Sequence, residues 1–254
     1  MSIRLNLFFI LLTAFIFSYF VPAFSIRAEE PQAELPYVEI DLIQRKLHYR
    51  TTSKVIKTYP IGVSKSKDFL TPTGVFQVLE MDDRPGWLHP YKKGVKIPPG
   101  PGNPLGTRWI GFYKNSTLNQ SYGIHGTNQP NSVGKFVSHG CIRMKIPDSE
   151  ELYRVVHVGT PVVVHYTRFD FQNHDGDIAL VINEDPFNLE PLTIENMKKH
   201  LTAKYPNIQL SQPALEFLAK NGTPGQTRLV GTLAKESNAQ PSSASTPKAV
   251  SPVK

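Results

Sequence analysis

Ser138-His139-Gly140-Cys141-Ile142-Arg143-Met144 contains the only cysteine in a sequence of 254 residues. A lone cysteine cannot form a disulfide within its own chain, so we expect its role to be chemical. A second histidine lies upstream, in Gly123-Ile124-His125-Gly126-Thr127. A cysteine nucleophile requires a base to take its proton, and two nearby histidines supply candidates. Most of the functional prediction depends on these two segments.

The two ends of the chain differ from the rest. Arg4 precedes an apolar run from Leu5 to Val21, which is followed by Pro22, the stretch Ala23-Phe24-Ser25 and, a little further on, Ala28. This layout is typical of a secretory signal peptide at residues 1–28, although the run is nearly long enough to be an uncleaved membrane anchor. Residues 235–254 are rich in Ser, Pro, Ala and Lys, which predicts a disordered tail. We expect an exported protein of the cell wall or periplasm.

The charge of the chain favours an anionic partner. The formal net charge is +7 at pH 7, and the sequence pI is near 9.4. Charge alone does not distinguish nucleic acid, an anionic cell envelope and a solvated basic surface. Because the N-terminal segment predicts export, we expect the envelope and not nucleic acid. No second long apolar stretch follows the first, so we expect the remainder to be soluble.

Residues 37–166 show mostly the pattern of short strands. Val38, Ile40 and Leu42 alternate with polar residues, as in a half-buried strand. Other runs are rich in Val, Ile, Phe and Tyr and are bounded by Gly or Pro. These further predicted strands are residues 47–49, 55–63, 74–80, 108–113, 162–166 and, later in the chain, 178–182. The predicted fold class is mainly β, a sandwich or barrel.

Three helices are predicted from capping residues and apolar spacing. The first begins after Asp148 as N-cap and ends at Gly159. The other two follow Thr193 and Ser211. Both lie in residues 167–234, which we interpret as a small, mixed but α-rich appendage to the main domain.

Residues 82–106 form a long stretch without a regular pattern. They contain six prolines and five glycines. A loop of this length in a compact domain is usually functional or disordered. Trp87 and Tyr91 stand among lysines here, so we predict a lid or substrate wall. The alternative is an ordered surface loop that does not touch a ligand.

The residues around the cysteine fit acyl transfer. A thiol becomes nucleophilic when an adjacent imidazole takes its proton, and by spacing alone either His125 or His139 is a candidate base. Gly140 beside Cys141 lets backbone N–H groups approach a developing oxyanion. Arg143 can bind a substrate carboxylate through two parallel hydrogen bonds, or can be a structural ion-pair partner. Together these parts indicate a cysteine acyltransferase or peptidase.

The Ser138–Met144 segment, preceded by His125-Gly126-Thr127, resembles the catalytic signature of the L,D-transpeptidases of the YkuD type. Three further segments are similar to that family, namely Tyr37–Leu42, Thr71–Phe76 and Asn103–Gly106. The resemblance covers residues 37–166. It implies a YkuD-like β-sandwich with a short helix and a long active-site loop.

The resemblance also implies roles for single residues. Cys141 would be the nucleophile, and His125 would accept and donate the proton with its ring oriented by the Gly126 carbonyl. His139 would support the cysteine loop or the oxyanion, and the N–H groups of Gly140 and Cys141 would bind the oxyanion. The residues expected to contact oxyanion or substrate are Ser138, Gly140, Arg143, Trp87 and Tyr91. No metal or organic cofactor is implied.

In that family a thiolate attacks the bond before the terminal D-alanine of a peptidoglycan tetrapeptide stem. The resulting acyl-thioester, here on Cys141, is then attacked by the amine of a diamino acid in a second stem. The partners implied are peptidoglycan stem peptides. Carbapenems, β-lactams that acylate this family, are expected to acylate Cys141.

Other interpretations of the same residues remain open. Cys141 could be a small buried hydrophobic residue, or a zinc ligand with the two histidines, although no fourth ligand is obvious. The same site could use water or another amine as acceptor, as an L,D-carboxypeptidase or a protein–peptidoglycan ligase does. A non-catalytic envelope-binding protein could keep the fold.

Overall fold

The computed structural model describes residues 34–89, 92, 94–118 and 120–234. The predicted signal segment, the predicted tail and Tyr91 lie outside the described residues. The described residues from Glu34 to Ala234 belong to one compact unit. Within the described part of the chain, no helix has the length and apolar character needed to cross a bilayer.

A five-stranded sheet begins at the predicted strand near Tyr37. Its strands, in spatial order, are β3 (Val55–Pro60), β2 (Lys46–Arg50), β1 (Tyr37–Asp41), β13 (Pro161–His165) and β5 (Gly74–Gln77). The central pair β1 and β13 is parallel, and the other neighbours are antiparallel. Val38 and Ile40 of β1 are fully buried. The alternation along β1 therefore places its apolar side chains in the core, as predicted.

A second, four-stranded sheet contains the segments with the cysteine and the histidine. Its spatial order is β12 (Ile142–Arg143), β10 (Gln120–His125), β9 (Trp109–Asn115) and β6 (Glu80–Asp82). The β10–β12 pair is parallel. The sequence did not predict β10, because Gly123 interrupts its apolar pattern.

The two sheets share one hydrophobic core. Val38, Val162 and Val164 from the first sheet belong to the same buried cluster as Ile110 and Ile124 from the second. Burial of one such side chain stabilises the fold by roughly 1.5–3 kcal/mol. The chain is therefore mainly β, with a sandwich core behind the strands of the site.

Two short strand pairs and two 3-10 turns complete this part of the described chain. β4 (Val63–Ser64) pairs in parallel with β11 (Phe136–Ser138), and β7 (Trp87–Leu88) pairs with β8 (Lys96–Ile97). Two 3-10 turns, η1 (Lys67–Phe69) and η2 (Pro130–Ser132), lie between strands. The predicted lid thus contains a small hairpin of its own.

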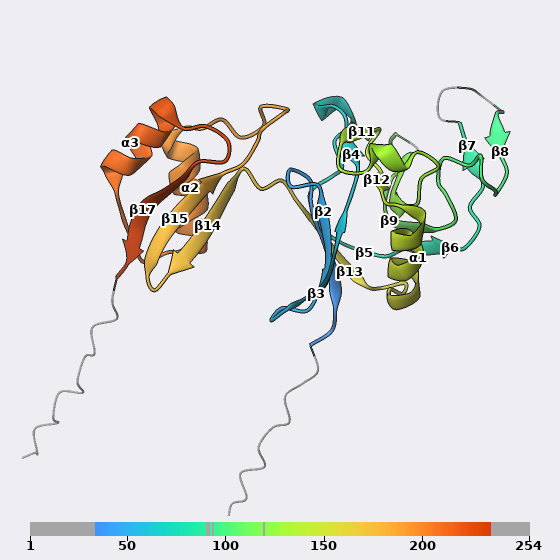
Figure 1. Ribbon diagram of the computed structural model, residues 1–254, viewed down its shortest axis with the longest axis horizontal. Helices are drawn as coiled ribbons and strands as arrows, with labels where there is room; N and C mark the ends of the chain where they lie inside the picture. Colours follow the sequence, from blue (N-terminus) through green and yellow to red (C-terminus); the bar gives the residue numbers. More distant parts are fainter. Residues whose placement is uncertain (1–33, 90–91, 93, 119, 235–254) are drawn as a thin grey trace, which may run out of the picture. The chain divides into compact units, whose positions relative to one another are not determined.

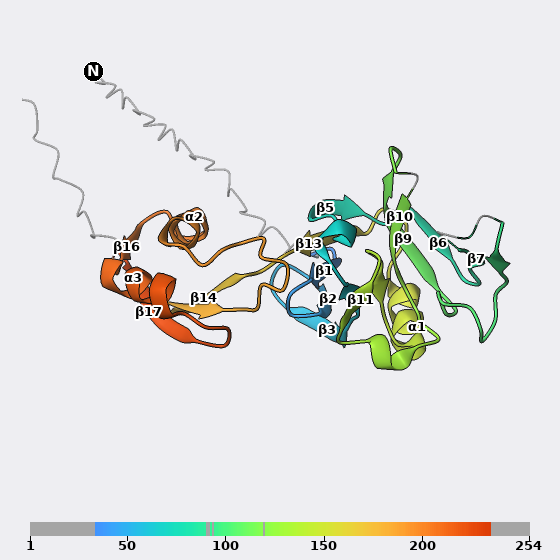
Figure 2. The ribbon, with the colours of Figure 1, turned by 90° about the horizontal axis from the view of Figure 1, so that it is seen from above.

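The first helix, α1 (Ile146–Val155), lies beside β9 in both ribbon views (Figure 1, Figure 2) and contacts β10. The predicted N-cap at Asp148 is wrong, because Lys145 is the N-cap and Asp148 lies in the first turn. Pro147 favours this earlier start, since a first-turn residue needs no N–H for a helical hydrogen bond. The helix also ends before the predicted Gly159.

Residues after Thr167 contain more strand than the sequence predicted. A four-stranded antiparallel sheet has the order β14 (Phe169–His174), β15 (Asp177–Ile182), β17 (Thr227–Leu233) and β16 (Ile208–Leu210). The two predicted helices are α2 (Ile194–Lys204) and α3 (Gln212–Asn221), and they contact each other as well as this sheet. A separate hydrophobic cluster joins them. Thr193 caps α2 as predicted, accepting a hydrogen bond from Asn196 N–H.

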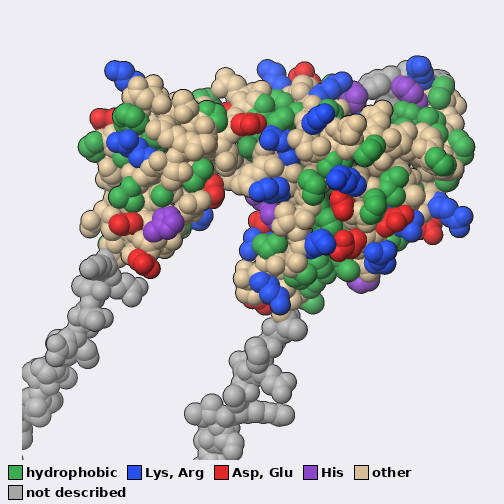
Figure 3. Space-filling view, viewed as in Figure 1, with side chains coloured by type: hydrophobic (Ala, Val, Ile, Leu, Met, Phe, Trp, Pro, Cys, Tyr) green, Lys and Arg blue, Asp and Glu red, His purple; other side chains and the backbone are tan. Residues whose placement is uncertain are grey.

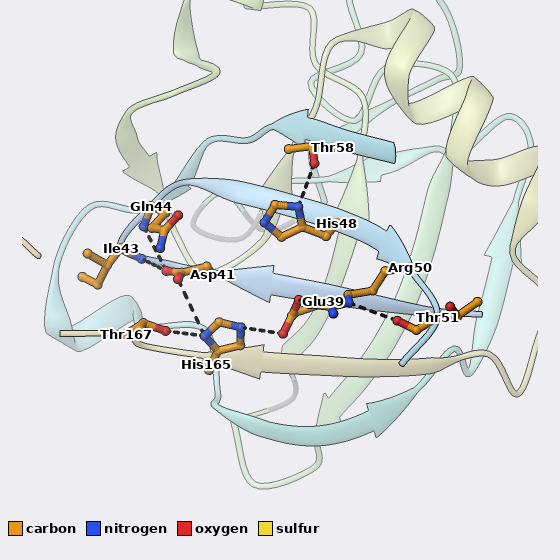
Figure 4. A network of polar contacts seen from close by, with 10 residues as sticks. All are labelled: Glu39, Asp41, Ile43, Gln44, His48, Arg50, Thr51, Thr58, His165 and Thr167. Atoms are coloured by element: carbon orange, nitrogen blue, oxygen red, sulfur yellow. Dashed lines mark hydrogen bonds and ion pairs between the residues drawn. The ribbon is translucent and has the colours of Figure 1, made fainter. Parts of the chain in front are cut away.

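A polar network crosses the first sheet (Figure 4). His165 Nε2 lies 3.4 Å from Glu39 Oε1, and its Nδ1 lies 3.7 Å from Asp41 Oδ2. Arg50 Nη1 donates to Glu39 Oε2 at 2.8 Å. Burial disfavours the imidazolium, but Glu39 and Asp41 outweigh burial and the charge of Arg50, so the pKa of His165 is raised. The contact with His165 is the largest influence that lowers the pKa of Glu39 to about 2.

These shifts predict a pH-dependent contribution to stability. Because the pKa of His165 is raised on folding, its ionic contribution is complete below about pH 6.5 and is lost as pH rises through the folded-state value. Glu39 stays ionised down to a pKa of about 2. His165→Gln should therefore lower the free energy of unfolding most between about pH 5 and 6.5, by up to about 1 kcal/mol. Urea denaturation of both proteins across pH measures this.

The matched control is His48→Gln on the neighbouring strand β2. Burial lowers the pKa of His48, so protonation of His48 opposes folding and its pH dependence has the opposite sign. If the loss of unfolding free energy in His165→Gln grew between pH 6.5 and 8, the raised pKa assigned to His165 would be contradicted.

Candidate active site

Strand pairing brings the two chemical segments together. β10 ends at His125, and β12 begins directly after Cys141. In their parallel ladder His125 is paired with Arg143, and Met144 N–H donates to the His125 carbonyl at 2.8 Å. The cysteine loop is therefore fixed beside the histidine by backbone hydrogen bonds.

The turn before the cysteine requires glycine. Gly140 has φ +113°, and a Cβ there would lie 2.6 Å from the Tyr122 ring. The Gly140 N–H donates to Ser138 Oγ at 3.1 Å, and its carbonyl accepts from Thr71 Oγ1 at 2.7 Å. Ser138 and Thr71 are both buried. The N–H expected from Gly140 for an oxyanion thus has a partner within its own loop.

Cys141 is partly exposed, and its thiol donates to the Ser121 carbonyl at 3.7 Å. Burial raises the pKa of the Cys141 thiol, while hydrogen bonding from the Gly123 N–H and the charge of Arg143 oppose this rise. The β9–β10 ladder has a register shift between Tyr122 and Gly123. Such bulges redirect backbone groups beside active sites, and here one borders the sulfur.

His125 is buried, and its Nδ1 contacts the carbonyl of Gly126. A carbonyl only accepts hydrogen bonds, so Nδ1 carries the hydrogen and Nε2 is left as the acceptor. Burial lowers the pKa of His125 to about 4, with the Gly126 carbonyl opposing and Arg143 adding to the shift. At neutral pH the imidazole is an uncharged base.

His139 has a different environment. Lys65 Nζ lies 2.8 Å from its Nε2, and the ring packs edge-on against Phe69 with centroids 4.7 Å apart. An ammonium group only donates, so Nε2 accepts this hydrogen bond. Burial lowers the pKa of His139, and Lys65 and Arg143 lower it further. The Nε2 lone pair is therefore already engaged.

Arg143 is half-buried next to the thiol. Its Nη1 donates to Gln129 Oε1 at 3.4 Å, and its backbone exchanges two 2.8 Å hydrogen bonds with Gly62. Burial lowers the pKa of Arg143, and its interaction with Cys141 opposes the shift. The guanidinium supplies positive charge at the site.

The predicted lid is held together by Asn103. This fully buried side chain donates to the carbonyls of Pro85, at 2.7 Å, and Pro98, at 3.2 Å. Trp87 pairs with Ile97 across the β7–β8 hairpin and packs on His89. The described contacts of Trp87 thus lie within the lid and do not join it to the cysteine loop.

Several residues of the site were not predicted as such from the sequence. They are Lys65, Thr71, Trp109, Ser121 and Gly123. Thr71 lies in a segment that already resembled the family, so a signal was present. The other four residues are brought to the site by strand pairing, and the local sequence contains no motif that predicts this pairing. Among the described residues, no group of three or more His, Cys, Asp or Glu side chains is placed to hold a metal ion.

Comparison with known proteins places part of the chain in a family. Residues 35–164 match the model of the YkuD family, the L,D-transpeptidase catalytic domain. The chain belongs to this family. YqjB of Bacillus subtilis, whose name marks it as a candidate L,D-transpeptidase, is 41% identical over 137 residues, which are 54% of this chain and 74% of that protein.

Other matches cover a similar part of the chain. A candidate L,D-transpeptidase YkuD of Bacillus licheniformis is 38% identical over 131 residues, 51% of this chain and 66% of that protein. The catalytic domain of the Enterococcus faecium L,D-transpeptidase is 28% identical with a TM-score of 0.41, over 53% of this chain and 99% of that one. The similarity to this family therefore spans about half of the present chain.

The pKa shifts predict how the thiol reacts with an alkylating agent. Cys141 is the only cysteine, so every alkylation event reports on it. Because burial raises its pKa above the ordinary value of 9.0, the rate with iodoacetamide should be low at pH 7 and keep rising above pH 9. Mass spectrometry of samples quenched at different pH values measures this rate.

Arg143→Gln serves as a comparison, because removing that charge should move the alkylation midpoint to still higher pH. Rapid alkylation at pH 6 would contradict the inference that Cys141 and His125 are both uncharged. It would indicate that they already form a thiolate–imidazolium pair.

Proposed function

We propose that this protein is an L,D-transpeptidase that forms peptidoglycan cross-links through an acyl-enzyme on Cys141. The observation that most supports this proposal is the buried His125, whose Nδ1 contacts the Gly126 carbonyl beside the cysteine loop. An imidazole held in this way has one free acceptor nitrogen, as a general base requires.

In the first half-reaction the Cys141 sulfur attacks the carbonyl before the terminal D-alanine of a tetrapeptide stem. His125 Nε2 takes the thiol proton and then gives it to the leaving D-alanine amine. Since the Gly140 N–H already donates to Ser138, we assign the oxyanion chiefly to the Cys141 N–H and give Gly140 the role of shaping the loop. The C–S bond forms first and gives a tetrahedral oxyanion, and the C–N bond breaks when this intermediate collapses to the thioester.

In the second half-reaction the side-chain amine of a diamino acid in another stem attacks the thioester. His125 accepts a proton from this amine and returns it to the departing Cys141 sulfur. Water or a different amine in the same position would give carboxypeptidase or ligase activity. The chemistry requires no metal or organic cofactor.

Charges around the site suit an anionic substrate. We assign Arg143 to a stem carboxylate, because its half-buried guanidinium lies beside the reacting thiol. Burial, together with the charge of Lys65, lowers the pKa of His139, which fits a supporting role for His139 in the cysteine loop. On the face shown in Figure 3, basic and acidic side chains are interspersed over the surface. Trp87 remains a proposed substrate contact of the lid.

The N-terminal segment supports a location for this activity. Its charged, apolar and small-residue regions favour export, and peptidoglycan lies outside the cytoplasmic membrane. We therefore propose that the protein acts in the cell wall or the periplasm, with its substrate as the anionic partner.

A purified disaccharide tetrapeptide tests the proposed reaction. Incubation with the protein should release D-alanine and give a cross-linked dimer of stems, detected by mass spectrometry. A disaccharide tripeptide without dimer would instead assign a carboxypeptidase, and unaltered substrate would exclude both activities.

The matched control is Cys141→Ala, which should release no D-alanine while keeping the fold. A carbapenem presents a strained amide to the same thiol, so we also propose that carbapenems add covalently to the wild-type protein and not to Cys141→Ala. Dimer formation by the alanine variant would show that another group is the nucleophile.

A further inference from the structure

Trp109 lies against the proposed base. It is the direct partner of His125 across the antiparallel β9–β10 ladder. The two ring centroids are 6.0 Å apart, and the ring planes are inclined by only 25°. This is the offset-stacked arrangement that aromatic rings prefer. The indole and imidazole rings are therefore stacked with their centres offset.

Two glycines make room for the indole. A Cβ on Gly123 would lie 2.6 Å from two carbons of the Trp109 ring, and a Cβ on Gly111 would lie 2.9 Å from its Nε1. Contacts this short do not occur, so larger residues at either position would displace the ring. The indole thus lies flat across both strands, over positions without side chains.

A hydrogen-bonded chain fixes the ring in its own plane. Trp109 Nε1 donates to Glu80 Oε1 at 3.2 Å, and Lys114 Nζ lies 2.6 Å from Glu80 Oε2. The hydrogen bond from Lys114 is the largest influence lowering the pKa of Glu80, so the carboxylate is an ionised acceptor. Since Glu80 belongs to β6, three neighbouring strands hold the indole.

We propose that Trp109 is a positioning residue of the transpeptidase reaction, whose indole face fixes the plane of His125 and stabilises the imidazolium formed when Cys141 loses its proton. The proposal rests on the proposed function for its chemistry. An aromatic face attracts a cation, and this attraction is stronger where water is excluded. The neutral imidazole gains less from this contact, so the contact favours the charged intermediate.

The other neighbours of His125 give its imidazolium form little stabilisation. Burial and the charge of Arg143 both disfavour the imidazolium, whereas the hydrogen bond to the Gly126 carbonyl favours it. The thiolate of Cys141 would be its counter-ion during the reaction. Trp109 adds a second favourable contact, from the face of the ring rather than its edge.

The test compares Trp109→Leu with Trp109→Phe in the full chain. Leucine removes the aromatic face, whereas phenylalanine keeps a ring face and loses the hydrogen bond to Glu80. With a carbapenem as probe, Trp109→Leu should lower the first-order acylation rate constant at pH 7 about tenfold, with the half-saturating concentration unchanged. Trp109→Phe should recover most of this rate.

A second readout does not depend on turnover. In NMR titrations the pKa of the His125 ring should fall further in Trp109→Leu and stay near the wild-type value in Trp109→Phe. Glu80→Gln keeps the indole face, so it should resemble Trp109→Phe in both measurements. A residue that served only packing would lower the melting temperature without moving this pKa.

Different results would contradict the proposed function and the positioning role of Trp109. If the wild-type protein is not acylated, the proposed function fails, and the titration alone decides the role of Trp109. If acylation proceeds but Trp109→Leu changes only the half-saturating concentration, Trp109 is a substrate contact and the inference is overturned. An unchanged His125 pKa in Trp109→Leu would also overturn it.

Discussion

The parallel pairing of β10 with β12 is the constraint on which the site depends. Ile124 and Ile142 are paired in this ladder and both are fully buried, so the core fixes the register of the two strands. The same register pairs His125 with Arg143 and places Cys141 just before β12. A slip by one residue would turn these side chains to the opposite face of the sheet. The hydrophobic core and the chemistry are therefore specified by one set of backbone hydrogen bonds.

The surroundings of Cys141 and His125 at this ladder explain the expected charge state of the two side chains. Burial raises the pKa of Cys141 and lowers that of His125, so both are uncharged at rest. In the proposed reaction, charge forms only when the proton moves from Cys141 to His125. The groups that can stabilise this charge are already in place, because Gly123, Gly126 and Arg143 belong to the same strands or directly follow them. Such preorganised dipoles need little rearrangement during the reaction.

Elements and motifs with a local sequence pattern could be predicted from the sequence. Features that depend on the pairing of distant strands could not. The alternation in Tyr37–Asp41 predicted β1, and the segment around Cys141 predicted the family. The helix start was misplaced at Asp148, since capping residues also occur within first turns. Trp109 could not be recognised, because its contact with His125 follows from strand register and from glycines elsewhere in the chain. Most of the strands after Thr167 were not predicted, because they too depend on pairing between distant segments.

The most direct test of the proposed acyl-enzyme is to identify the residue that holds the acyl group during turnover. A reaction with disaccharide tetrapeptide, quenched in acid and digested, can be mapped by mass spectrometry. An acyl-enzyme on Cys141 predicts a disaccharide-tripeptide mass on the peptide containing this residue, and this mass should disappear when an acceptor amine is added in excess. Turnover without any adduct on that peptide, or an adduct on another residue, would contradict it.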